Sequence, residues 1–190
     1  IGGKMSKKFN YLILVLFFGL AEEIYASSID QNVINHKKQF SDLAIEIWNH
    51  AEMGYQETKS SNLLAYELEK EGFTITKNVA DIPTAFIAEY GSGGPVIGIL
   101  GEFDALPGLA QSNSPFKEVI DNGTGAGHAC GHHLFGAASA WAAVAVKEWL
   151  EFNGIKGRVR FYGTPAEEGG SGKVYMVREG LFDDVDIVLH

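Results

Sequence analysis

The stretch VIGILGEFDALPG, residues 96–108, determines which fold class this sequence predicts. Its first five residues, Val96 to Leu100, form a continuous apolar run, which is typical of a strand covered on both faces. Glu102 and Asp104 follow directly, so polar side chains begin where the strand ends. A sheet with two covered faces lies between layers of helices. The stretch therefore favours an α/β domain.

Helical and extended patterns alternate through the rest of the chain. We expect helices over 30–52, 57–71, 132–153 and 172–179, and strands over 73–79, 84–90, 158–162 and 185–189. Gly72 and Gly154 stand where two of these helices should end. Residues 107–127 are rich in Pro, Gly, Asn and Ser and predict a long loop. Strands that alternate with helices predict a largely parallel central sheet.

The composition excludes several classes of function. The chain has 190 residues, 46% of them hydrophobic and 21% charged, which indicates a globular protein with a core. Lys and Arg number 15 against 24 Asp and Glu, a net charge of -9, so we expect no nucleic-acid partner. The single cysteine, Cys130, excludes an internal disulfide framework and a four-cysteine zinc site.

The N-terminal residues have the pattern of a targeting segment. Met5 is the expected start, two lysines follow, and residues 11–21 form an apolar run of 11 residues. That run is too short for a stable membrane span, which needs roughly 18 residues, but it fits a secretory signal peptide. We expect a signal peptide over residues 1–26, cleaved after Ala26, and an exported protein that is periplasmic or secreted. A buried N-terminal helix is the alternative.

The C-terminal end predicts a longer protein. The apolar segment 185–189 reads as a buried strand, and His190 follows it without a further helix or tail. A domain rarely ends on an uncovered central strand. We therefore expect the chain to be the front part of a larger protein.

Candidate metal ligands collect where the predicted strands end. Asp104 follows the strand at 96–100, Glu167 and Glu168 follow the strand at 158–162, and His190 follows the last strand. Cys130 and His132 lie two residues apart in a turn flanked by glycines. In α/β sheets ligands bind beyond the carboxyl ends of the strands. Thiolate, imidazole and carboxylate together suit a zinc-like divalent ion.

The adjacent residues Glu167 and Glu168 predict two separate roles. Neighbours on an extended segment point to opposite sides, so one can bind metal while the other faces the substrate. Metal-assisted hydrolysis needs both a ligand carboxylate and a base for the water.

Taken singly, each candidate residue also fits an ordinary structural role. A cysteine can be a small buried hydrophobe, an acidic pair can lie at the surface, and Asp104 can be a turn residue. Only their joint placement favours a site.

Four motifs together resemble a known family: GEFDALPG (101–108), GHACGHHLFGAA (127–138), GTPAEEGGSGK (163–173) and VDIVLH (185–190). They resemble the dinuclear metallopeptidase family of aminoacylases and carboxypeptidases. Within it they are similar to the amidohydrolase branch, which holds N-acyl amino acid, indole-acetyl-amino-acid and p-aminobenzoyl-glutamate hydrolases. The resemblance implies a zinc-exopeptidase-like three-layer α/β domain with a mixed, mostly parallel sheet. Residues 27–190 would be its N-terminal part.

The resemblance also implies a role for each candidate. The implied metal ligands are Cys130, His132, Glu168 and His190. Glu167 matches the general base that takes a proton from water, and Asp104 matches the acidic residue that supports a ligand histidine. Two divalent ions, of zinc, manganese or cobalt, would be bound. The role of His128 stays open, and His133 stands where the family has Asp or Asn.

The implied function is metal-dependent hydrolysis of an amide bond, by metal-activated water with a glutamate base. The substrate would be a small N-acyl or aryl-acyl amino acid, of the aminobenzoyl-glutamate kind, or a short peptide. The family's fifth ligand, a histidine, and its lid domain would lie beyond residue 190, and a homodimer or heteromer would form through that lid. The alternative is a non-catalytic metal-binding or assembly subunit that needs a partner chain.

Overall fold

The computed structural model describes residues 33–190, and residues 37–190 form one compact unit. The predicted signal peptide lies outside the described residues. Among the helices that are described, none is long and apolar enough to cross a membrane.

A five-stranded mixed sheet forms the centre of this unit, in the order β1-β2-β6-β3-β7. Its strands are β1 (Thr74–Lys77), β2 (Phe86–Ser92), β3 (Val96–Gly101), β6 (Gly157–Gly163) and β7 (Ile187–Leu189). β3 pairs in parallel with β6 and with β7, whereas β2 pairs antiparallel with β1 and with β6. The prediction of a mixed sheet is confirmed, but the sheet is not mostly parallel.

Short connections explain the antiparallel half of the sheet. Residues 78–85, which include the 3₁₀ helix η1 (Val79–Asp81), join β1 to β2, and residues 93–95 join β2 to β3. A parallel pair needs a crossover of roughly a dozen residues or more, so these links reverse the chain direction. β6 then inserts between β2 and β3, parallel to one and antiparallel to the other.

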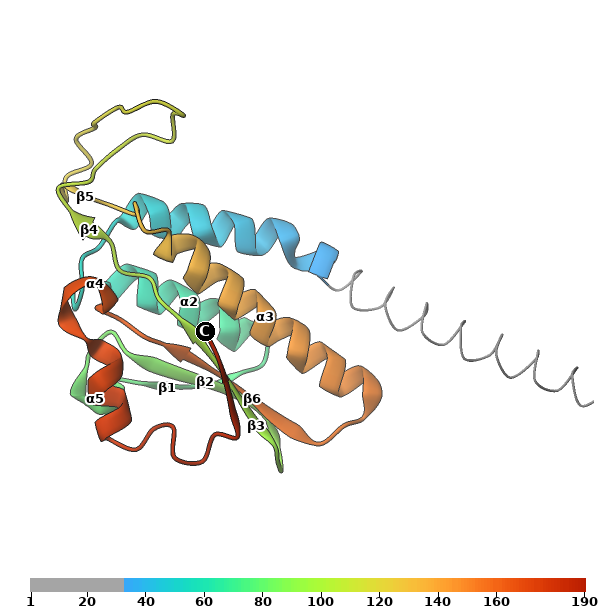
Figure 1. Ribbon diagram of the computed structural model, residues 1–190. Helices are drawn as coiled ribbons and strands as arrows, with labels where there is room; N and C mark the ends of the chain where they lie inside the picture. Colours follow the sequence, from blue (N-terminus) through green and yellow to red (C-terminus); the bar gives the residue numbers. More distant parts are fainter. Residues whose placement is uncertain (1–32) are drawn as a thin grey trace, which may run out of the picture. The chain divides into compact units, whose positions relative to one another are not determined.

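Helices cover both faces of the sheet, which confirms the three-layer prediction (Figure 1). Residues 33–50 are helical, and from residue 40 onward this helix packs with α2 (Thr58–Lys70) and α3 (His132–Asn153) over one face. The short helix α5 (Gly172–Arg178) packs on the other face. Each face of the sheet has its own hydrophobic core, and adjacent strand residues alternate between them. Phe161 lies in the core under α2 and α3, and Tyr162 lies in the core under α5.

Two small elements lie within segments that the sequence predicted as irregular or extended. The predicted loop over 107–127 contains a two-stranded antiparallel pair, β4 (Leu106–Pro107) and β5 (Ala126–Gly127). The acidic pair that follows β6 lies in a short helix, α4 (Glu167–Gly170).

The last strand differs from its prediction. β7 lies at the edge of the sheet and pairs with β3 alone. Its side chains Ile187, Val188 and Leu189 are 52%, 46% and 52% exposed, so the prediction of a buried strand is wrong for the chain as described. An apolar run indicates a strand, but its burial depends on which neighbours cover it.

Candidate metal centre

The carboxyl ends of β3 and β6 and the start of α3 meet at one edge of the sheet. Because β3 and β6 are parallel, the residues that follow each strand emerge at the same edge. α3 approaches this edge so closely that a Cβ at Gly136 would lie 2.6 Å from the carbonyl oxygen of Glu102. The absence of a side chain at Gly136 lets the first turn of α3 bring His132 to the strand end.

His132 lies at the centre of the site, between two carboxylates. Its Nδ1 is 2.9 Å from Oδ1 of Asp104, and its Nε2 is 2.9 Å from Oε2 of Glu102. All three residues are at most 5% exposed. Burial alone would lower the pKa of His132, but the hydrogen bonds to Asp104 and Glu102 outweigh it and raise the pKa to about 10. The imidazole therefore carries a proton that a metal ion would have to displace.

Two groups of potential metal ligands share His132. Cys130, His132 and Glu168 form one group, and Glu102, His132 and Glu167 form the other. Within each group the ligand atoms lie within 4.8 Å of one another. The structure thus brings three of the four predicted ligands together. Thiolate, imidazole and carboxylate donors are those that zinc-like ions prefer.

The polar atoms of Glu168 and Cys130 fit a bound cation. Oε1 of Glu168 is buried and has no hydrogen-bond partner among the described residues. Its distance to Nδ1 of His132 is 3.9 Å, too long for a hydrogen bond. Desolvation and the neighbouring Glu168 and Glu167 raise the pKa of the Cys130 thiol. A cation here would satisfy the carboxylate oxygen and favour the thiolate.

Glu102 is a functional candidate that the sequence analysis did not assign. Besides His132 it contacts Lys173 of α5 and His190, whose Nε2 is 3.0 Å from Oε1 of Glu102. Burial would raise its pKa, but the hydrogen bonds from these three groups hold it at about 2. The sequence did contain a signal for Glu102. It lies two residues before Asp104, and side chains two residues apart on an extended segment point to the same side.

The remaining predicted residues lie at the same edge. His190 contacts Glu102 rather than the group around Cys130. Asp104 is 1% exposed, and besides the ring of His132 it accepts a hydrogen bond at Oδ2 from the backbone N–H of Glu168, at 2.9 Å. This placement agrees with the supporting role implied for Asp104.

Glu167 and Glu168 diverge, but not for the predicted reason. They belong to α4 rather than to an extended segment. Successive helical residues are rotated by about 100°, which also separates two neighbouring side chains. Glu167 is the more open of the two, with 44% of its side chain exposed and a carboxylate oxygen 3.8 Å from Nε2 of His132.

The other histidines of the motif lie in an aromatic cluster. The ring of His133 packs edge-on against Trp48 at 4.9 Å and lies 5.1 Å from the ring of His128. His128 lies 3.1 Å, through Nε2, from the carbonyl oxygen of Ile47. Burial lowers the pKa of both histidines, that of His128 to about 4. Both rings are therefore neutral at pH 7 and form part of the packing.

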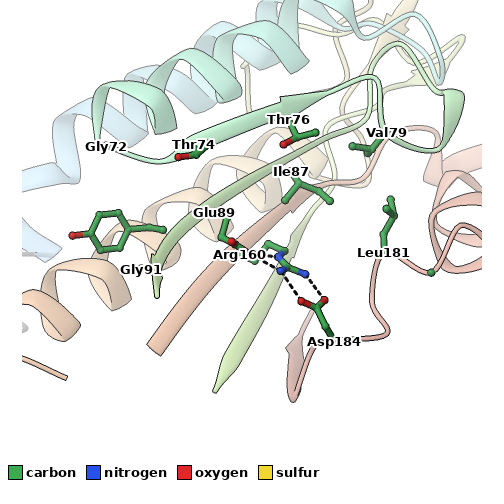
Figure 2. A pocket seen from close by; sticks show the side chains of 12 residues that line it. Gly72, Thr74, Thr76, Val79, Ile87, Glu89, Gly91, Arg160, Leu181 and Asp184 are labelled. Carbon is green, nitrogen blue, oxygen red and sulfur yellow. Dashed lines mark hydrogen bonds and ion pairs between the residues drawn. The ribbon is translucent and has the colours of Figure 1, made fainter. Parts of the chain in front are cut away.

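A second charged cluster lies elsewhere on the sheet. Arg160 of β6 donates to Glu89 from Nε at 2.6 Å, and to Asp184 from Nη1 at 2.6 Å and Nη2 at 2.9 Å. Figure 2 shows these ion pairs in a cavity of about 640 Å³, which also has Thr74, Thr76 and Leu181 in its wall. Nη1 of Arg160 also donates to the hydroxyl of Tyr162, at 3.0 Å.

Comparison with known proteins identifies the family. Residues 98–190, which include every predicted site residue, match the family described as Peptidase family M20/M25/M40. The chain is 51% identical over 168 residues to one of the subunits of the p-aminobenzoyl-glutamate hydrolase of Escherichia coli, an alignment that covers 88% of this chain and 35% of that protein. Residues 98–190 form part of a domain of the M20/M25/M40 peptidase family.

Two further relatives support this assignment. The chain is 32% identical to the human Xaa-Arg dipeptidase, over 77% of this chain and 33% of that protein. A Bacillus subtilis dinuclear metal binding peptidase of the M20 family has the same fold, with a TM-score of 0.67 and 29% identity over 80% of this chain and 41% of the other. The chain spans about a third of the length of the curated relatives named here.

Proposed function

We propose that this protein hydrolyses the amide bond of a small N-acyl or aryl-acyl amino acid, or of a short peptide, with divalent metal ions at the site around His132. One observation carries the proposal: four carboxylates converge there, those of Glu102, Asp104, Glu167 and Glu168. Among the described residues of this cluster, Lys173 is the only permanently charged cation. The buried, unpartnered oxygen of Glu168 adds to this unbalanced negative charge.

Cys130, His132 and Glu168 would hold one ion, and Glu102 and His190 are placed to contribute to the second. When bound, such ions supply Lewis acidity, which polarises an amide carbonyl and lowers the pKa of water. Asp104 would hold Nδ1 of His132 and leave Nε2 as the ligand nitrogen. Zinc, manganese and cobalt all suit this donor set.

Glu167 would serve as the general base and then as the general acid. Its carboxylate is partly exposed, so a substrate and a water molecule can reach it, and it lies beside the group of ligands that it would serve. It would take a proton from water as the water attacks the amide carbon, and deliver that proton to the leaving amine. The E. coli relative is named for an aryl-acyl amino acid, which supports that substrate class.

The proposal extends to assembly and location. The E. coli relative is one of the subunits of a hydrolase, and we propose that this protein likewise assembles, with a second copy or with a different chain. Export to the periplasm or the medium rests on the signal-peptide pattern of residues 1–26. The non-catalytic alternative has less support, because a protein that only binds metal has no need of a base beside the ligands.

The test is a metal count and an amide-hydrolysis assay on the complete protein, with Glu167→Gln as the variant. We expect about two ions per chain in both proteins. The assay would use N-acyl and aminobenzoyl amino acids, and the glutamine, which cannot take a proton, should lower kcat by at least about 100-fold. Absence of metal from the wild type would refute the proposed site. Bound metal without hydrolysis, unless a partner chain is added, would favour an assembly role.

A further inference from the structure

We infer that Glu57 is a positioning residue that holds the backbone on which Glu167 is carried, an inference that rests on the proposed function. Glu57 lies at the N-terminus of α2, far from Glu167 in the sequence. It was not among the residues that the sequence analysis assigned to the site.

The side chain of Glu57 is fully buried and aimed at the loop before α4. The residue is 0% exposed. Its Oε1 accepts the backbone N–H of Ala166 at 2.8 Å, and its Oε2 accepts the hydroxyl of Thr84 at 3.0 Å. Burial is the largest influence on its pKa, which is raised to about 7 despite these hydrogen bonds. A glutamate buried this completely is rare unless its oxygens have such partners.

The backbone that Glu57 holds is in an unfavourable conformation. Ala166 has φ 57° and ψ 44°, the left-handed region that residues with a side chain seldom adopt. Such a residue persists only where its surroundings fix it. The bond from Ala166 N–H to Glu57 is one such restraint, and it acts at the residue directly before Glu167.

The residue directly after Glu167 is held in the same way. The backbone N–H of Glu168 donates to Oδ2 of Asp104, at 2.9 Å. Glu167 therefore lies between two backbone N–H groups that are each bound by a buried carboxylate. The two hydrogen bonds, one on each side of Glu167, together restrict the loop that carries the base.

The segment around Glu57 lies along the same loop. A Cβ at Gly54 would be 3.0 Å from the Cα of Ala166, so a side chain here would crowd the backbone of that residue. The hydroxyl of Tyr55 donates to the carbonyl oxygen of Gly170, at the end of α4. Glu57 is thus part of a surface that fits the loop from Ala166 to Gly170. A misplacement of about 1 Å in a catalytic group can cost roughly 100-fold in rate.

The experiment compares four variants in the complete protein. Glu57→Leu removes both acceptors. Glu57→Asp keeps the carboxylate but shortens its reach. Glu57→Gln keeps a carbonyl oxygen for the N–H of Ala166. Ser61→Ala is the matched control, because Ser61 lies in the first turn of α2 and its buried hydroxyl donates to the carbonyl of Thr84, not to the loop. The readouts are kcat, KM, metal content, and amide hydrogen exchange of residues 164–170.

We expect Glu57→Leu to lower kcat by about 100-fold because the base is misplaced, with KM and metal content nearly unchanged because the bond from the N–H of Glu168 to Asp104 still holds that ligand. Exchange over residues 164–170 should accelerate while that of α3 stays slow. Glu57→Asp should lower kcat and accelerate exchange in the same way, at about a tenth of the size. This variant carries the test if the leucine variant does not fold. Glu57→Gln should retain kcat within about fivefold, since a neutral acceptor remains.

The inference is overturned if Glu57→Asp and every folded Glu57→Leu sample keep wild-type kcat and exchange, or if Ser61→Ala changes them equally. The two kinds of readout separate this inference from the proposed function. If the wild type hydrolyses no amide, the proposed function fails, and hydrogen exchange still decides whether Glu57 holds the loop.

Discussion

Arg160 and His132 each lie between two carboxylates, yet the two clusters differ in what is left unpaired. Arg160 binds Asp184 through two nitrogens, binds Glu89 through a third, and also donates to Tyr162. Asp184 and Glu89 have 52% and 33% of their side chains exposed, so water can reach the carboxylates as well. Arg158 adds a second cation, with Nη1 3.4 Å from Asp184 and 3.8 Å from Glu89, so the two positive and two negative charges balance without any ligand.

The cluster around His132 is not balanced. Its carboxylates outnumber its cations, Oε1 of Glu168 is buried without a partner among the described residues, and Glu102 and Asp104 are almost inaccessible to water. Buried polar groups without partners are costly, so such a cluster suits a bound cation. Cavity size is therefore the weaker guide to the site. The large cavity adjoins the satisfied arginine, whereas the proposed metal site lies where charges are unsatisfied.

The largest expected effect is the loss of metal on removal of the central histidine. His132→Ala should weaken metal binding by at least about 100-fold and abolish turnover, because both ligand groups share this residue. Metal analysis after dialysis and the amide assay measure the two effects. Arg160→Met is the matched control and should keep both ions. Equal metal loss in the two variants would remove the distinction between the clusters.

An intermediate effect is expected on stability. Arg160→Met leaves Glu89 and Asp184 with only the longer contacts to Nη1 of Arg158, at 3.8 and 3.4 Å, so we expect the free energy of unfolding to fall by about 2–3 kcal/mol. This is below the cost of a fully buried pair, because both carboxylates are partly exposed. Urea denaturation measures it. A loss of kcat in the folded variant would contradict the structural role of Arg160.

The smallest expected effect is the acid dependence of the arginine cluster. The hydrogen bonds from Arg160 lower the pKa of Asp184 from 3.8 to about 2. A lowered pKa stabilises the folded state above pH 3.8, and this contribution disappears as the pH falls through about 2. Stability measured by urea between pH 5 and 2 should therefore fall less steeply in Asp184→Asn. The difference should be small, because the side chain is half exposed. An identical pH dependence of stability in the wild type and in Asp184→Asn would show that the pair of Arg160 and Asp184 adds nothing to stability.

Much of the fold could be predicted because its signals are local. The apolar run at 96–100 indicated a strand covered on both faces, and β3 is such a strand. Gly154 was expected to end the long helix, and it ends α3 with φ 60°. Glycine adopts this left-handed conformation without strain, so the position can be found without knowing the fold.

The remainder depends on contacts that local patterns do not encode. The apolar pattern of residues 187–189 indicates a strand, but not whether another element covers it. Cys130, His132 and Glu168 could be grouped because each follows a strand or begins a helix at the same edge. Glu57 could not be assigned to the site from the sequence, because one glutamate at the start of a helix ordinarily indicates a solvated residue. Only the tertiary structure shows that it is buried against Ala166.

The exposed strand β7 has a practical consequence for handling this chain. It pairs with β3 on one side only, and its three apolar side chains are about half exposed. An open apolar edge of this kind is a template for strand addition by another molecule, which leads to aggregation. Expression of this stretch by itself is therefore best attempted at low temperature and low protein concentration, or with a charged residue at Val188 to discourage intermolecular pairing.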